Sequence, residues 1–134
     1  LLTPHPLEAS RLLGKSVAEV EQDRYLSASS LSKKFGSLVV LKGRGTLIAS
    51  GDECTVVNQG NTVLSKGGSG DILAGLAGSL LGQTMSKNAA ALAVFIQGRT
   101  AERLAARMGT ERAALPSEVF REIPETLREL ESIP

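Results

Sequence analysis

The chain has 134 residues, enough for one domain with a substantial apolar core, and we expect residues 1–134 to belong to a single domain. Its 15 basic and 14 acidic residues give a net charge of +1, which argues against a nucleic-acid or membrane surface as a partner. No apolar run is long enough to span a membrane, and the lone Cys54 cannot form an internal disulfide, so a reducing, cytoplasmic location is expected.

The first residues are Leu1-Leu2, without a methionine. An apolar pair at a free end is typical of a strand whose beginning is missing, so we expect the chain to be a piece of a longer protein. Two prolines follow within Thr3–Pro6, and they predict a stiff extended turn that orients His5 and leads into a helix at Pro6. A lone histidine is more often structural or merely exposed than functional, so both interpretations of His5 stay open.

The next segment has the pattern of surface helices. Ser16 is predicted to cap a helix with Glu19 as its capping-box partner. Apolar and charged residues alternate from there to Phe35 as they do in an amphipathic helix or helix pair, and Gly36 is a natural end.

An uninterrupted apolar run at Leu38–Leu41 is typical of a strand buried on both faces in a parallel sheet. We expect it to be the central strand of an α/β fold with three or four strands in this chain. Leu47–Ala49 and Cys54–Val57 are predicted as two further strands, joined by a hairpin turn over Ser50–Glu53.

A flexible basic loop is predicted after the first strand, and it comprises Lys42, Gly43, Arg44, Gly45 and Thr46. It lies at the carboxyl end of that strand, where open α/β sheets bind ligands. Lys42 is therefore either a phosphate-binding group or an ordinary solvated charge. The loop is not a P-loop, because the pattern G-x-x-x-x-G-K-[ST] occurs nowhere in the chain.

A glycine-rich turn at Gly67–Asp71 precedes a mostly apolar segment, which is predicted to form a helix from Ser69 to Leu81 that ends at Gly82. A helix start leaves several backbone N–H groups unpaired at the positive end of the helix dipole, and glycines let a ligand approach them closely. The turn is therefore predicted to bind an anion while Asp71 takes a proton from a nucleophile. The alternative is that Asp71 only caps the helix.

Three more helices are predicted toward the carboxyl end. Ser86 is expected to cap a long helix that runs to Met108. A short helix begins at Leu115–Ser117, and Pro124 opens another over Glu125–Glu131.

Four of these elements form a joint pattern in their order along the chain. They are Thr-Pro-His-Pro-x-Glu from Thr3, Lys-Gly-x-x-Thr from Lys42, the Gly60-Asn61 pair and Gly-Gly-Ser-Gly-Asp from Gly67. The pattern resembles the ADP- or ATP-dependent NAD(P)H-hydrate dehydratases of the ribokinase-like superfamily, and the resemblance extends to Leu130. Gly-x-Gly-Asp is shared with sugar and vitamin kinases, whereas the histidine element points to the dehydratases.

The resemblance implies a ribokinase-like three-layer sandwich, of which this chain is the carboxyl-terminal half, with few strands flanked by helices. It also implies that hydrated NADH or NADPH is the substrate. Its hydroxyl is phosphorylated by ATP or ADP, which is accompanied by Mg²⁺, and is then eliminated as phosphate. Phosphorylation turns hydroxide, a poor leaving group, into a good one.

The same resemblance assigns roles to residues and implies no metal site made by the protein itself. Asp71 is the catalytic base, and Asp71 and His5 contact the hydrated dinucleotide. The nucleotide is bound by Lys42, Gly43, Arg44, Gly45, Thr46 and Gly70. The anion hole for the transferring phosphate is formed by Gly68, Ser69 and Gly70.

The chain departs from the family pattern in three respects, of which the first is Leu7 in place of the family's glycine after the second proline. Lys66 stands where the family has threonine, and it brings an extra cation that is either useful near the phosphates or merely solvated. The chain also lacks the amino-terminal half of a family domain, so we expect it to pair with that half or with a second copy. Two alternatives remain open: a sugar or pyrimidine-precursor kinase of the same superfamily, and a nucleotide-binding fragment without catalysis.

Overall fold

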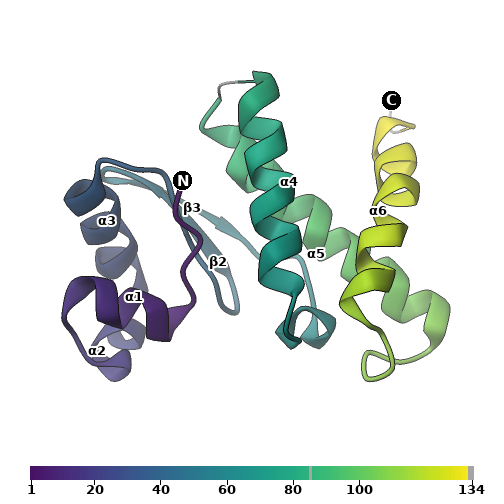
Figure 1. Cartoon of the computed structure of the whole chain (residues 1–134), viewed down its shortest axis with the longest axis horizontal. Coiled ribbons are helices and arrows are strands. Elements are labelled where there is room, and N and C mark those ends of the chain that lie inside the picture. Colours follow the sequence, from purple (N-terminus) through teal and green to yellow (C-terminus); the bar gives the residue numbers. More distant parts are fainter. Residues whose placement is uncertain (85, 133–134) are drawn as a thin grey trace. The chain divides into compact units, whose positions relative to one another are not determined.

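The computed structural model describes residues 1–84 and 86–132 (Figure 1). The chain forms two compact units, and each is described by itself. Unit 1 comprises Leu1–Asn58 and Ser86–Ala91, and unit 2 comprises Gln59–Met85 and Leu92–Pro134. Within the described ranges, no helix is both long and apolar enough to cross a lipid bilayer.

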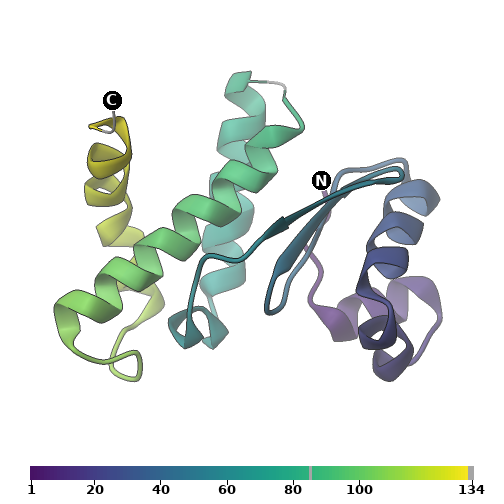
Figure 2. The same ribbon diagram turned by 180° about the vertical axis from the view of Figure 1, so that it is seen from behind.

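Unit 1 contains a three-stranded antiparallel sheet in the order β1-β2-β3 (Figure 2). The strands are β1 (Val39–Leu41), β2 (Thr46–Ser50) and β3 (Glu53–Val57). The hairpin predicted between β2 and β3 is confirmed, and Gly51 takes the left-handed conformation in its turn, with φ 62°. The predicted number of strands, three or four, is therefore also correct for the described residues.

β1 is buried as its apolar run predicts, because the side chains of Val39–Leu41 have no exposed surface. The predicted parallel sheet, however, is wrong for the described residues, where β1 and β2 are antiparallel and only Leu2 forms a parallel bridge, to Val39. The reason lies in the connection: a few residues join β1 to β2, whereas parallel neighbours need a crossover of about a dozen or more. With Leu2 on one side and β2 on the other, β1 is not a solvated edge.

Three helices accompany this sheet: α1 (Pro6–Leu13), α2 (Val17–Gln22) and α3 (Arg24–Phe35). α3 packs against β1 and β2, and α1 and α2 pack against α3 or one another. The predicted capping box of α2 is confirmed, since Ser16 Oγ accepts the Glu19 N–H at 3.2 Å and Glu19 Oε2 accepts the Ser16 N–H at 2.8 Å. The core of the unit consists of small and aliphatic residues, among them Ala9, Val20, Ala28, Leu31, Val39, Leu41, Leu47 and Ala49.

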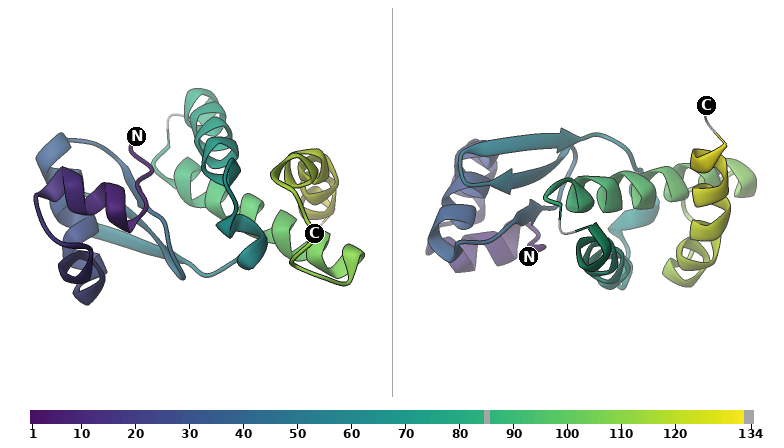
Figure 3. Two further views of the ribbon diagram at one scale, coloured as in Figure 1. Left: turned by 60° about the horizontal axis from the view of Figure 1, so that its bottom comes forward. Right: turned by 90° about the horizontal axis from the view of Figure 1, so that it is seen from above.

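Unit 2 is helical, and its elements are the 3₁₀ helix η1 (Thr62–Ser65), α4 (Ser69–Thr84), most of α5 (Asn88–Met108) and α6 (Pro116–Glu131). The chain passes from η1 through the glycine turn into α4 (Figure 3). The long helix to Met108 is confirmed, and Ser86 Oγ accepts the Asn88 N–H at 3.2 Å at its start. The apolar core comprises Val63, Ala101, Leu104, Ala114 and Val119.

Two predicted helix boundaries are wrong. Gly82 does not end α4, which continues to Thr84, whose hydroxyl donates to the Leu80 carbonyl oxygen at 3.0 Å. Pro124 does not open a new helix but lies inside α6. Residues on both sides of this proline are buried, among them Glu122 and Thr126. Thr126 Oγ1 also donates to the Glu122 carbonyl oxygen at 3.3 Å.

Candidate active site

The amino-terminal turn is fixed beside the end of β1. The Val40 N–H donates to the Leu2 carbonyl oxygen at 2.8 Å, and the Lys42 N–H donates to the Pro4 carbonyl oxygen at 2.9 Å. Because the chain leaves this pairing directly at His5, the backbone brings His5 next to the loop that follows β1. The two sequence motifs of unit 1, which are 37 residues apart, thus lie together.

Glu8 connects His5 with Lys42. Its Oε2 atom accepts the His5 N–H at 2.7 Å and lies 3.7 Å from Lys42 Nζ, while Oε1 lies 3.5 Å from His5 Nε2. The backbone hydrogen bond from His5 and, less strongly, the positive charge of Lys42 lower the pKa of the Glu8 carboxyl. His5 Nδ1 accepts the Glu8 N–H at 3.2 Å, so a neutral imidazole carries its proton on Nε2, facing the carboxylate.

Glu8 was not predicted as a site residue, although it is the last residue of the Thr-Pro-His-Pro-x-Glu pattern. The signal was its spacing: a glutamate three residues after the residue that precedes a helix completes a capping box. His5 fills the other half of that box, since its imidazole is the capping group of α1. His5 is therefore a helix cap with an exposed side chain, which is compatible with contact to a ligand.

The basic loop after β1 is held by Arg24 of α3. Arg24 Nη1 donates to the Arg44 carbonyl oxygen at 2.6 Å, and Nη2 lies 3.3 and 3.4 Å from the carbonyl oxygens of Leu41 and Lys42. Gly43 has φ 149°, and a Cβ atom there would lie 2.6 Å from Arg24 Nη2. The loop was predicted to be flexible, but this guanidinium ties down its backbone. Sequence reasoning missed Arg24 because a charged residue of a surface helix carries no distinguishing signal.

The rest of the loop turns sharply into β2. Gly45 takes the left-handed conformation, with φ 65°, and Thr46 Oγ1 donates to the Gly43 carbonyl oxygen at 3.1 Å. The backbone carbonyl groups are thereby engaged inside the protein, and the side chain of Arg44 is exposed. The loop presents cationic groups on a fixed backbone, which suits a negatively charged ligand.

The glycine turn in unit 2 ends in the left-handed residue Gly68, with φ 96°. Two backbone N–H groups of α4 reach back before the helix: that of Ser69 donates to the Lys66 carbonyl oxygen at 3.2 Å, and that of Ile72 donates to the Gly68 carbonyl oxygen at 3.3 Å. The N–H groups of Gly70 and Asp71 lie between these two, at the positive end of a 16-residue helix. N–H groups at the start of a helix are suited to binding an anion.

Asp71 is the third residue of α4 and is exposed. It therefore lies inside the first turn and not at the capping position before Ser69, where Gly68 stands. Among residues 1–84 and 86–132, its carboxylate has no hydrogen-bond or ion-pair partner. A carboxylate beside unpaired N–H groups and free of other contacts is placed to accept a proton from a bound hydroxyl.

Ser69 is anchored from α5. Gln97 Nε2 donates to the Ser69 carbonyl oxygen at 2.7 Å, and both residues are buried. The Ser69 hydroxyl is itself buried and finds no partner in the described part of the chain. Sequence reasoning missed Gln97, since a polar residue within a long amphipathic helix is usually exposed.

The polar turn before η1 also packs on α5. A Cβ atom on Gly98 would lie 2.6 Å from the Gln59 backbone, and the Gly60 N–H donates to Glu102 Oε1 at 2.8 Å. Asn61 Nδ2 donates to the Ala101 carbonyl oxygen at 3.1 Å. Only a glycine at position 98 permits this approach of turn and helix.

The predicted site residues thus form two groups. Unit 1 brings His5 together with the loop at Lys42, and unit 2 holds the turn that contains Gly68, Ser69, Gly70 and Asp71. The predicted nucleotide-binding set is therefore divided, with Gly70 in unit 2 and its other members in unit 1.

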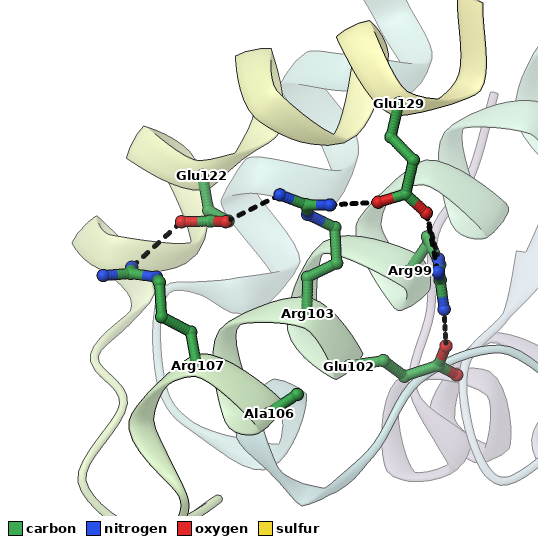
Figure 4. A pocket seen from close by; sticks show the side chains of 7 residues that line it. All are labelled: Arg99, Glu102, Arg103, Ala106, Arg107, Glu122 and Glu129. Atoms are coloured by element: carbon green, nitrogen blue, oxygen red, sulfur yellow. Dashed lines mark hydrogen bonds and ion pairs between the residues drawn. The ribbon is translucent and has the colours of Figure 1, made fainter. Parts of the chain in front are cut away.

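A cavity of about 300 Å³ in unit 2 contains none of these residues (Figure 4). Arginines from α5 and glutamates from α6 face each other across it, with Arg99 and Glu129 at 2.6 Å and Arg107 and Glu122 at 2.9 Å. Hydrogen bonds from Arg99 and from Arg103 lower the pKa of Glu129. Because its charges are paired with one another, we interpret this cavity as the ion-paired seam between two helices and not as the reactive centre. It is lined by Arg99, Glu102, Arg103, Ala106, Arg107, Glu122 and Glu129.

The described residues contain no group of three or more His, Cys, Asp or Glu side chains that could hold a metal ion. A divalent cation that travels with a nucleotide needs fewer protein ligands, because Mg²⁺ is commonly bound through phosphates, waters and one or two carboxylates. Asp71 is the carboxylate nearest in sequence to the glycine turn, so the donor set fits a cation of that kind.

The sequence is similar to a family of known proteins. Residues 1–125 match the family described as NAD(P)H-hydrate dehydratase. The bifunctional NAD(P)H-hydrate repair enzyme Nnr of Escherichia coli is 46% identical over 122 residues, which are 90% of this chain and 24% of that protein. The ADP-dependent (S)-NAD(P)H-hydrate dehydratase of Neisseria meningitidis is 43% identical over 121 residues, 89% of this chain and 41% of that one.

Solved structures give the same result. The ADP/ATP-dependent NAD(P)H-hydrate dehydratase of Bacillus subtilis, co-crystallised with ATP and Mg²⁺, superposes with a TM-score of 0.86 at 32% identity. The match covers 96% of this chain and 47% of that structure. A ribokinase-like superfamily protein of Enterococcus faecalis superposes with a TM-score of 0.81 at 28% identity, over 96% and 44% of the two chains. The chain has the mixed helix and strand content of the ribokinase-like fold and spans less than half the length of these proteins.

Proposed function

The chain belongs to the NAD(P)H-hydrate dehydratase family, and from this premise we propose that it supplies the nucleotide-binding loop and the catalytic turn of an enzyme that dehydrates hydrated NADH or NADPH. One observation carries the proposal beyond the family: the free carboxylate of Asp71 shares the first turn of α4 with the unpaired N–H groups of the glycine turn. A base and an anion site combined in one turn suit phosphoryl transfer to a hydroxyl.

The proposed reaction has two steps. Asp71 accepts the proton of the hydroxyl on the nicotinamide ring as the hydroxyl oxygen attacks the terminal phosphoryl group of ATP or ADP. The N–H groups of Gly70 and its neighbours meet the negative charge on that phosphoryl group. This first step releases ADP from ATP, or AMP from ADP. The carbon–oxygen bond then breaks, phosphate leaves with the former hydroxyl oxygen, the adjacent ring carbon loses a proton, and the ring returns to the reduced dinucleotide.

We propose that the groups of unit 1 bind and do not react. Lys42 and Arg44 attract the phosphates of the nucleotide, and His5 contacts the hydrated dinucleotide through its exposed imidazole. Mg²⁺ bound to the nucleotide phosphates neutralises part of their charge when it is present. The B. subtilis structure was co-crystallised with ATP and Mg²⁺, and the N. meningitidis relative is ADP-dependent, which supports this choice of ligands.

The proposed activity concerns the whole enzyme, because this chain covers only 24% to 47% of the proteins named above. Apolar side chains such as Leu115 and Phe120 are exposed, at 57% and 65%. We propose that they pack against the rest of the ribokinase-like domain, or against a second copy, since a surface of this kind is unfavourable in water. A single 14 kDa species in concentrated solution would argue against this pairing.

We also propose a cytoplasmic location, which the lone Cys54 supports.

The test is an assay of phosphate release by the full-length protein, with ATP and with ADP. Hydrated NADH should release phosphate and restore the absorbance of reduced nicotinamide in equal amounts. A parallel panel of sugars and hydroxymethylpyrimidine should release none. Phosphorylated product from that panel, with no turnover of the hydrate, supports a kinase instead and overturns the proposal.

A further inference from the structure

The ammonium group of Lys66 is bound by backbone carbonyl oxygens. Its Nζ atom lies 2.6 Å from the Arg112 oxygen and 3.5 Å from the Glu111 oxygen, and it also donates to the Ala114 oxygen. No carboxylate forms an ion pair with it in the described ranges. An ammonium has three N–H donors, so three carbonyl oxygens of one loop use all of them. The sequence alone left two roles open for Lys66, a cation near the phosphates or a solvated charge. In the structure its ammonium is bound by backbone carbonyl oxygens of the protein.

The same loop contacts the glycine turn at its other end. A Cβ atom on Gly68 would lie 3.5 Å from Pro116 Cβ, which is an ordinary packing distance. The backbone of Lys66 takes part as well, since its carbonyl oxygen accepts the Ser69 N–H at 3.2 Å. The loop before α6 thus binds Lys66 at the beginning of the turn, and Pro116, the first residue of α6, lies beside Gly68 at its end.

We propose that Lys66 is a positioning residue, whose ammonium occupies a cage of three carbonyl oxygens and thereby fixes the anion-binding turn. Without a cation, three carbonyl dipoles directed at one point repel each other, and the loop moves away from the turn. The N–H groups of Gly70 and Asp71 then lose their common direction. This inference rests on the proposed function, because it assigns the turn to the reacting phosphoryl group.

The substitution Lys66→Met tests it in the full-length protein, because methionine keeps an apolar stem and removes the charge. We expect kcat to fall by about 10- to 100-fold, the scale of a misplaced reacting geometry, while KM for hydrated NADH is unchanged. Ammonium chloride should restore most of the lost kcat, because the ion can enter the empty cage. Tetramethylammonium chloride at the same ionic strength should not, because it is too large and has no N–H donor.

Two controls accompany this variant. The wild type should not respond to ammonium, and Lys33→Met, which removes a surface ion pair with Asp52, should keep its kcat. A Lys66→Met enzyme with wild-type kcat overturns the inference, and so does equal restoration by both salts.

A second measurement separates this inference from the proposed function. Ammonium, but not tetramethylammonium, should raise the melting temperature of Lys66→Met, whether or not any hydrate is turned over. If the methionine variant does not fold, Lys66→Gln is measured in its place. If ammonium does not specifically raise the melting temperature of the variant, the cage is overturned. If ammonium does raise it but the wild type is inactive, only the proposed function is overturned.

Discussion

The two groups of predicted site residues are built in different ways. In unit 1, charged side chains face one another, as the Glu8 carboxylate lies between the His5 imidazole and the Lys42 ammonium. In unit 2, the turn before α4 offers backbone N–H groups and a single carboxylate, that of Asp71, which has no partner among the described residues. One region is an electrostatic cluster, and the other is a fixed backbone with one free base.

The difference has a chemical consequence. Paired side chains can exchange one partner for another, which suits the reversible binding of a charged ligand. Fixed N–H groups need no rearrangement when charge develops on them, which suits a reaction step. We therefore expect substitutions in the first region to change binding and substitutions in the second to change turnover.

The largest effect is expected from Asp71→Asn in the full-length enzyme. Removal of a positioned general base should lower turnover by about 10²- to 10⁴-fold, with little change in nucleotide affinity. Phosphate release and the melting temperature, measured on the same variant, check this. Near-normal turnover with a normal melting temperature would show that Asp71 is not the base.

Lys42→Ala should weaken nucleotide binding and leave turnover nearly unchanged. It removes charge-assisted contacts of about 1.5–3 kcal/mol from bound phosphates, so the Kd for ATP or ADP should rise by roughly 10- to 100-fold. At saturating nucleotide, kcat should change little. Calorimetric titration measures the affinity, and an unchanged Kd assigns Lys42 to the ordinary surface charges and removes the contrast between the two regions.

Gly98→Ala tests whether the second region depends on close backbone packing. The new Cβ atom would lie 2.6 Å from the Gln59 backbone, so we expect a loss of about 1–3 kcal/mol in the free energy of unfolding. The matched control is Gly75→Ala in α4, where nothing lies within 4 Å and alanine should stabilise the helix by about 0.5–1 kcal/mol. Urea denaturation measures the free energy of unfolding of both variants. If Gly98→Ala is as stable as the wild type, the turn can move away from α5.

The smallest effect is a pH dependence at Glu8. Its pKa is lowered in the folded protein, so the bond to the His5 N–H and the pairing with Lys42 stabilise the fold above the ordinary glutamate pKa of 4.5, and this contribution disappears as pH falls through the lower folded value. Glu8 is half exposed, so the contribution is below about 1 kcal/mol. Glu8→Gln should therefore be less stable than the wild type at neutral pH, and the gap should close in acid. A gap that is constant down to about pH 3 would contradict this.

Local chemistry explains which elements could be predicted from the sequence. The capping box at Ser16, the hairpin after Ser50 and the burial of Leu38–Leu41 follow from residues that are close in sequence. The antiparallel pairing of β1 was missed because its run of apolar residues indicates burial on both sides and not strand direction. The sequence predicts a helix end at Gly82 and a helix start at Pro124, but α4 and α6 continue through these residues.

The motifs of the candidate site could also be found from the sequence, but their supports could not. Arg24 and Gln97 each hold the backbone of a motif from a distant part of the chain, by donating to carbonyl oxygens. Lys66 stands beside the glycine motif and donates to carbonyl oxygens of a loop more than 40 residues away. A charged or polar side chain that binds a backbone group has no fixed spacing from its partner. Such contacts become visible only in three dimensions.

The central claim is that the hydroxyl of the hydrate is phosphorylated at the glycine turn and leaves as phosphate. Hydrated NADH that carries a heavy oxygen isotope in its hydroxyl tests this directly. After one turnover with unlabelled ATP or ADP, mass spectrometry of the released phosphate should find the label in it, because the carbon–oxygen bond is the one that breaks. Label recovered in water, with none in phosphate, would contradict the account.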